Sequence, residues 1–255
     1  MHPSHDQGCG CVDGHRRTLL KATLGATALG AIGGFSLLAP LLAEAEALTK
    51  TALSREMRDK LTPDQIIALM KEGNERFRSG KTEMHDYVAQ KRASAGGQYP
   101  AGVVLSCIDS RAPAEIIFNV GIGAMFNARI AGNVANDDLL GSLEFACALA
   151  GAKVVFVMGH TACGAITGAI DHAQLGNLTG LLEKIKPAVQ ATKYDGERTS
   201  KNDAFVDAVA RTNVELTIDA IRKRSDVLAG LEREGKIKIV GGMYHLVGGL
   251  VEFYA

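Results

Sequence analysis

Three side chains that bind metal ions well occur in two short motifs of the chain. Cys107 ends an apolar run that begins at Val103, and His160 and Cys163 follow a second apolar run at 153–158. Two thiolates and one imidazole suit zinc, which binds sulfur and nitrogen ligands in a tetrahedron. Because three protein ligands leave the fourth position open, this set is typical of a catalytic zinc site rather than a structural one.

A carboxylate and a guanidinium accompany the first motif. Asp109 and Arg111 follow Cys107 at intervals of two residues. Side chains two apart in an extended segment share a face, so we expect these three to lie together. Arg111 can hold Asp109 by a charge-assisted, bidentate contact. Asp109 would then accept a hydrogen bond from a zinc-bound hydroxide or, in a closed state only, become the fourth metal ligand.

The segments that must position these side chains alternate between two patterns. Apolar runs rich in β-branched residues predict inner strands at 103–106, 153–158 and 237–240, and 125–130 is a further candidate strand. Helical patterns separate them, which predicts an α/β fold with a mostly parallel central sheet flanked by helices. Sites in such sheets form beyond the carboxyl ends of the strands, where both motifs fall. We therefore expect Cys107, His160 and Cys163 to converge at one edge of the sheet.

Helix signals fill the remaining chain. Thr62-Pro63-Asp64-Gln65 combines an N-cap, a proline in the first turn and a capping glutamine, and Gly80 ends that helix. Further helices are expected at 85–93, 113–118, 137–149, 163–172, 178–192 and 202–231, the last broken near Ser225, and a hairpin or edge strand at 250–254.

Composition limits the class of protein. The chain has 255 residues, with 28 Lys plus Arg balanced by 28 Asp plus Glu. This length fits one domain with a substantial core, and the absence of net charge argues against nucleic-acid binding. An odd number of cysteines, five, does not indicate a disulfide framework. Cys147, among apolar residues of a predicted helix, is interpreted as a packed thiol.

The first 47 residues have the pattern of an export signal. Arg16-Arg17 precedes an uncharged stretch at 22–43, and Ala-x-Ala sequences follow at 43–47. The paired arginines resemble a twin-arginine signal, which predicts a cleaved segment 1–47, a domain at 48–255 and a periplasmic or secreted protein. The alternatives are an ordinary secretory signal or an uncleaved anchor, which would be the protein's membrane contact. Cys9 and Cys11 are interpreted as part of the discarded head.

Several motifs together resemble the β-class carbonic anhydrases of the bacterial type. The resemblance rests on Cys-Ile-Asp-Ser-Arg at 107–111, Gly-His-Thr-Ala-Cys-Gly at 159–164 and Ala-Gly-Asn at 131–133. Gly-Ser-Leu-Glu at 141–144 and Glu-Gly-Asn-Glu-Arg-Phe at 72–77 extend it, so it covers the chain from about residue 61 onward. One departure is Ala124, where relatives usually carry an acidic residue.

The resemblance implies a role for each matching residue. Cys107, His160 and Cys163 would hold one Zn²⁺ per chain, with Asp109 and Arg111 as the dyad beside it. The implied reaction is the reversible hydration of CO2 to bicarbonate and a proton by zinc-bound hydroxide. The implied assembly is a homodimer or homotetramer with the active site near the subunit interface.

Substrate contacts and rival functions are less closely tied to the motifs. Backbone amides near Gly164, at a helix start, favour bicarbonate, and Gly132 with Asn133 is expected to shape the loop over the site. No proton relay is identified; His172 and His245 are candidates by residue type only. Alternative functions are a zinc hydrolase of carbonyl sulfide or carbon disulfide, and a non-catalytic zinc-binding periplasmic protein.

Overall fold

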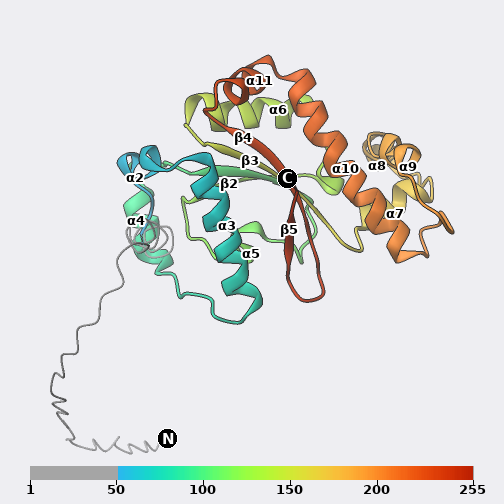
Figure 1. Ribbon diagram of the computed structural model, residues 1–255, viewed down its shortest axis with the longest axis horizontal. Coiled ribbons are helices and arrows are strands. Elements are labelled where there is room, and N and C mark those ends of the chain that lie inside the picture. Colours follow the sequence, from blue (N-terminus) through green and yellow to red (C-terminus); the bar gives the residue numbers. More distant parts are fainter. Residues whose placement is uncertain (1–50, 255) are drawn as a thin grey trace, which may run out of the picture. The chain divides into compact units, whose positions relative to one another are not determined.

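A five-stranded sheet forms the centre of the protein (Figure 1). The computed structural model describes residues 51–254; the predicted export signal, with Cys9 and Cys11, lies outside them. The strand order is β2-β1-β3-β4-β5, with the first four parallel and β5 antiparallel to β4. The strands are β1 (Gly102–Ser106), β2 (Met125–Arg129), β3 (Val154–His160), β4 (Lys238–Tyr244) and β5 (Val251–Phe253). The predicted α/β fold is therefore confirmed.

Helices cover both faces of this sheet. The α-helices are α2 (Arg55–Lys60), α3 (Pro63–Arg78), α4 (Tyr87–Ser94), α5 (Ala114–Ile117), α6 (Asp137–Glu144), α7 (Gly164–Ile170), α8 (Gly176–Glu183), α9 (Lys186–Ala191), α10 (Asp203–Arg224) and α11 (Asp226–Arg233). A 3-10 turn, η1 (Ala131–Asn133), follows β2, and a π-helical turn, η2 (Phe145–Leu149), extends α6. Within residues 51–254, none of the helices has the length and apolar character needed to cross a membrane.

The inner strands are apolar throughout because both of their faces are buried. Val104 and Phe156 pack with residues of α3 and α5 on one face. Val103 and Val155 point to the opposite face, where α6, α10 and α11 supply the contacts. A strand buried on both sides reads as a continuous hydrophobic run, which is why β1 and β3 stand out in the sequence.

Caps define the helix ends that the sequence indicated. The Thr62 hydroxyl accepts from the Gln65 amide at 3.2 Å, and the Gln65 side chain accepts in return from the Thr62 amide at 2.7 Å. At the predicted break, the Ser225 hydroxyl accepts from the Leu228 amide at 3.1 Å and starts α11. Side-chain acceptors of this kind satisfy amides that lack a partner within the helix.

Two helix predictions need correction. The segment 178–192 forms two helices, α8 and α9, because Pro187 in the first turn of α9 has no amide hydrogen to continue a helix. Helix α2 was not predicted, although Ser54 caps it through a 3.2 Å hydrogen bond from the Met57 amide. Its six residues are too few to give a clear helical period.

Helices α7, α8 and α9 lie past the carboxyl ends of the strands (Figure 1). With part of α10 they enclose a separate apolar cluster that includes Cys107, Cys163 and Phe205. The two sequence motifs therefore end in a buried environment rather than at an open sheet edge.

Candidate metal centre and active site

The register of two neighbouring strands brings the metal-binding side chains together. Strands β1 and β3 are paired in parallel, with Ser106 opposite Met158. Cys107 follows β1 directly, and His160 is the last residue of β3. The ligand atoms of Cys107, His160 and Cys163 all lie within 4.8 Å of one another, and all three residues are buried. The predicted convergence is confirmed.

The geometry and chemistry of this cluster fit zinc. Tetrahedral zinc with bonds of about 2.0–2.3 Å places two of its ligand atoms roughly 3.4–3.8 Å apart, so small inward shifts suffice. His160 Nδ1 lies 2.9 Å from the Thr161 carbonyl oxygen, which assigns the proton to Nδ1. His160 Nε2 is buried without a hydrogen-bond partner among the described residues. A bound cation satisfies such a nitrogen.

The two thiols are electrostatically different. The contact with the Cys163 thiol, together with His160 and the Gly132 amide, outweighs burial and lowers the pKa of Cys107 to about 4. The same contact and burial raise the pKa of Cys163. The Gly132 amide lies 3.4 Å from Cys107 Sγ and donates to it. A thiolate at Cys107 is therefore stabilised by the protein itself, as a metal ligand must be.

Asp109 and Arg111 form the expected pair, but by a turn rather than an extended segment. Arg111 donates to Asp109 from Nε at 3.0 Å, from Nη2 at 2.7 Å and from its own amide at 2.9 Å. The amide of Ala112 donates to the Asp109 carbonyl, so the chain turns here. The side chains meet across this turn, and the prediction that they share one face of an extended strand was wrong.

This pairing fixes the charge and position of Asp109. Hydrogen bonds from Arg111 lower the pKa of Asp109 to about 2, so it is a carboxylate at neutral pH. Its Oδ2 lies 3.8 Å from His160 Nε2, close to the metal ligands. Asp109 is not one of the three residues whose ligand atoms converge. Arg111 thus holds it beside the three candidate metal ligands.

A strained turn carries Cys163 to the centre. Ala162 has a φ of 51°, a left-handed conformation that is unfavourable for a residue with a Cβ. Asp207 of α10 accepts from the Ala162 amide at 3.0 Å, and Arg111 Nη2 donates to the Ala162 carbonyl at 3.3 Å. Thr161, by its hydroxyl, accepts from the Leu246 amide at 3.0 Å. Its role is that of a turn residue.

Three residues that hold the site in place were not predicted from the sequence. Arg129, at the end of β2, donates to the carbonyls of Cys107 and Asp109 at 2.9 and 2.6 Å. Asn213 and Asp207 act from α10 on segments far away in the sequence. Of the three, only Arg129 offered a signal, since it too lies at the carboxyl end of a predicted strand.

A cavity of about 290 Å³ opens beside the metal ligands. Its wall is mainly apolar, and the lining residues are Cys107, Ile108, Asp109, Ala131, Gly164, Ala165, Gly168, Ala173, Leu178 and Leu182. The Asp109 carboxylate and the Cys107 thiolate are the charged groups in this lining. Such a space suits a small uncharged molecule.

The predicted substrate-binding residues fall in two places. Gly164 lines the cavity, whereas Gly132 and Asn133 do not. Gly132 lies against Cys107, and the side-chain amide nitrogen of Asn133 is buried without a partner among the described residues. His172 and His245 do not line the cavity either. Cys147 is buried, and burial raises the pKa of its thiol to about 12, as expected for a packed thiol.

Comparisons with known proteins agree with this site. Residues 102–251 match a family model described as carbonic anhydrase. Carbonic anhydrase 2 of Mycobacterium tuberculosis is 36% identical over 186 residues, which are 71% of this chain and 87% of that protein. The carbonic anhydrase of Mycolicibacterium smegmatis is 34% identical over 189 residues, covering 72% and 89%. A β-carbonic anhydrase structure from Sordaria macrospora superposes with a TM-score of 0.56 at 24% identity, covering 63% of this chain and 83% of that one, and shares the fold.

Proposed function

The chain belongs to the β-class carbonic anhydrase family, and we propose how its own residues carry out the reversible hydration of CO2 to bicarbonate and a proton. The observation that carries the proposal is the buried Cys107, His160 and Cys163 cluster, with an ionised Asp109 beside it. Zinc is the cofactor, held by these three side chains. When bound, it makes a water molecule acidic enough to act as a nucleophile near neutral pH, a property for which carbonic anhydrases are the standard example.

Asp109 and Arg111 orient the nucleophile. As a carboxylate, Asp109 can only accept a hydrogen bond, so it fixes which way the attacking oxygen points. Arg111 holds both carboxylate oxygens and the Ala162 carbonyl, which prevents Asp109 from turning toward the metal ligands. The attacking water loses one proton to solvent, and its oxygen forms a bond to the CO2 carbon. One C=O electron pair of CO2 moves onto the oxygen of that C=O bond, which gives bicarbonate.

The cavity beside the cluster admits the substrate. Its apolar wall includes Ile108, Leu178 and Leu182, which suit a molecule without charge. Gly164 at the start of α7 offers a backbone position for the bicarbonate oxygens, since amides at helix starts favour anions.

A CO2 hydration assay on the zinc-loaded protein tests this function. Stopped-flow rates are measured above about pH 8, where water activated by zinc would be ionised. We expect Asp109→Asn to retain zinc and lose at least about 100-fold in rate, the effect of losing one well-placed polar contact in a transition state. Asp195→Asn, an exposed carboxylate elsewhere, is the matched control and should retain the wild-type rate.

The same assay separates the rival functions. Hydrolysis of carbonyl sulfide or carbon disulfide without CO2 hydration would identify the related hydrolases. A protein that binds one zinc and turns over none of the three substrates would be a binding protein. Full hydration activity in Asp109→Asn would refute the role of Asp109.

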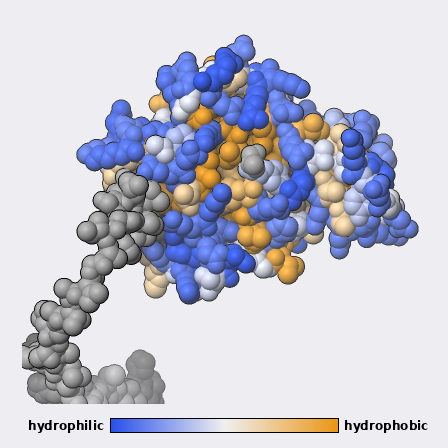
Figure 2. Space-filling model, in the orientation of Figure 1, coloured by the Kyte–Doolittle hydropathy of each residue, from blue (hydrophilic) through white to orange (hydrophobic). Residues whose placement is uncertain are grey.

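We propose that the chain assembles into a homodimer or homotetramer. The Sordaria macrospora relatives of the same fold are described as tetrameric. Figure 2 shows apolar residues gathered around β5, between α3 and α10. Val247 is 92% exposed and Leu250 is 41% exposed beside this uncovered edge strand, which favours contact with another chain. Light scattering coupled to size-exclusion chromatography should give twice or four times the chain mass; a monomer at micromolar concentration would contradict this.

We propose that residues 1–47 export a folded, zinc-loaded enzyme to the periplasm or beyond. The basis is the sequence pattern around Arg16 and Arg17. Replacing both by lysine should hold the protein in the cytoplasm of a host with a twin-arginine pathway, whereas Lys21→Arg should be exported normally. Export of the double-lysine variant would favour an ordinary secretory signal.

A further inference from the structure

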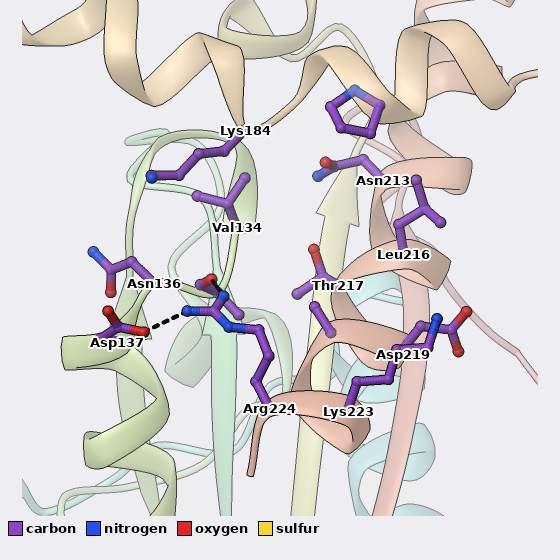
Figure 3. A pocket seen from close by; sticks show the side chains of 13 residues that line it. Val134, Asn136, Asp137, Lys184, Asn213, Leu216, Thr217, Asp219, Lys223 and Arg224 are labelled. Atoms are coloured by element: carbon purple, nitrogen blue, oxygen red, sulfur yellow. Dashed lines mark hydrogen bonds and ion pairs between the residues drawn. The ribbon is translucent and has the colours of Figure 1, made fainter.

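A second cavity shares no lining residue with the cavity beside the metal ligands. It is bounded by α10, the segment 134–137 and the junction of α8 with α9 (Figure 3). Its volume is about 450 Å³. Small-molecule sites in proteins commonly have volumes of roughly 300–1,000 Å³. The cavity is thus large enough for a metabolite of several carbon atoms.

Two lysines of the cavity lining carry unneutralised charge. Lys184 projects from the upper side in Figure 3, and Lys223 lies on the lower side. Neither makes an ion pair or side-chain hydrogen bond with any residue of the described chain. Arg224 between them is occupied, because it donates to the Ala135 carbonyl and to Asp137.

The carboxylates of the lining do not cancel these lysines. Asp137 is paired with Arg224. Asp219 makes no ion pair within the described chain, so the lining holds three cations, Lys184, Lys223 and Arg224, against the two carboxylates Asp137 and Asp219. The lining therefore keeps an excess of one positive charge, and neither lysine is paired within the described chain.

Polar groups without full partners lie at the back of the cavity. Thr217 is 5% exposed, and its hydroxyl makes no hydrogen bond with the described residues. Asn213 is 3% exposed and uses Nδ2 on the Gly132 carbonyl at 2.7 Å, which leaves Oδ1 unused within the same set. Figure 3 shows both side chains facing the cavity. Both atoms are therefore available to a ligand that enters the cavity, and until then they can bond to water.

We propose that this cavity binds a small organic carboxylate. Lys184 and Lys223 attract its charged groups from opposite sides, and the Thr217 hydroxyl donates to one of them. Val134 and Leu216 in the lining provide an apolar wall for its carbon body. Inorganic phosphate is also an anion but has no carbon chain. Comparing it with an organic carboxylate tests whether binding depends on negative charge alone or also on the apolar wall.

The back of the cavity is connected to a metal ligand. Asn213 donates to the Gly132 carbonyl at 2.7 Å, and the Gly132 amide donates to Cys107 Sγ at 3.4 Å. A ligand that contacts Asn213 would restrain these two hydrogen bonds, and through them the position of Cys107. Occupancy of the cavity should therefore slow the release of zinc.

Isothermal titration calorimetry of the zinc-loaded full chain with succinate tests the site. We expect binding in the wild type, weakened at least about tenfold in Lys184→Gln/Lys223→Gln, which loses two charge-assisted contacts. Lys193→Gln/Lys201→Gln removes two exposed lysines outside the cavity and should bind succinate as the wild type does. Thr217→Val keeps the side-chain shape and should also weaken binding.

Several outcomes would overturn the proposal. These are no succinate binding at millimolar concentration, equal binding in the two double-lysine variants, or phosphate binding as tight as that of succinate. A second measurement follows zinc loss to a chelator. Succinate should slow zinc loss in the wild type and not in Lys184→Gln/Lys223→Gln; equal rates with and without succinate would refute the connection to Cys107.

Discussion

Replacing Gly132 by alanine tests how the turn after β2 supports the metal centre. Gly132 has a φ of 71°, and a left-handed residue with a Cβ costs about 1–2 kcal/mol. The added Cβ would lie 2.4 Å from Ile185 Cδ1, well inside van der Waals contact. Ile185 is fully buried, so overpacking adds about 1–3 kcal/mol. The free energy of unfolding should therefore fall by roughly 2–5 kcal/mol.

Urea unfolding of the zinc-depleted protein is the appropriate assay. Zinc must be removed because a ligand of the folded state adds its binding energy to the measured stability. Ile185→Val removes the clashing Cδ1, so adding it to Gly132→Ala should restore about 1–2 kcal/mol, although the same change alone costs about 0.5–1.5 kcal/mol. Gly141→Ala is the control: its Cβ meets nothing within 4 Å, and it should stabilise α6 by up to about 1 kcal/mol.

The same variant should bind zinc more weakly. Gly132 donates its amide to Cys107 Sγ, and the forced shift of the turn lengthens that bond. Competition with a chelating dye measures the change in zinc affinity. The reasoning would be refuted if Gly132→Ala unfolded within about 0.5 kcal/mol of the wild type, the range of harmless surface changes, or if Ile185→Val gave no recovery.

Three further predictions concern single side chains. Cys163→Ser should lose zinc and CO2 hydration together, as measured by metal analysis and stopped flow; retained zinc would contradict its role as a ligand. Cys147, whose pKa burial raises to about 12, should resist thiol reagents near pH 8 until the protein is unfolded, which peptide mapping after labelling can check. Glu232→Gln should destabilise the protein by less than about 1 kcal/mol at neutral pH, because the partly exposed Arg222 pair lowers the pKa of Glu232 below its usual 4.5. That contribution is complete above pH 4.5 and disappears as the pH falls through the lowered pKa, so urea midpoints of variant and wild type should converge in acid.

Local patterns were enough to predict most of the fold. The runs at 103–106 and 153–158 indicate strands buried on both faces, and the cap at Thr62 marks a helix start, because these signals depend on neighbours in the sequence. The two errors in the helix predictions also have local causes. Helix α2 is too short to show a helical period, and Pro187 divides the segment 178–192 into two helices.

The metal cluster could be predicted because its residues lie at strand ends. Parallel strands place their carboxyl ends at one edge, so Cys107 and His160 meet once β1 and β3 are neighbours. The contacts that hold this cluster in place could not be predicted. Arg129, Asp207 and Asn213 reach Cys107, Ala162 and Gly132 across 22, 45 and 81 positions.

The amino-acid order alone determined which residues can bind zinc, which carboxylate can accompany them and which family they resemble. These properties depend on residue type and short spacing. Only the tertiary structure decided that Asp109 meets Arg111 across a turn, that Ala162 is held in a strained conformation, and that a second cavity lies behind Gly132. The last two features arise where α10 packs against loops distant in the chain, and no local pattern encodes the position of one packed element relative to another.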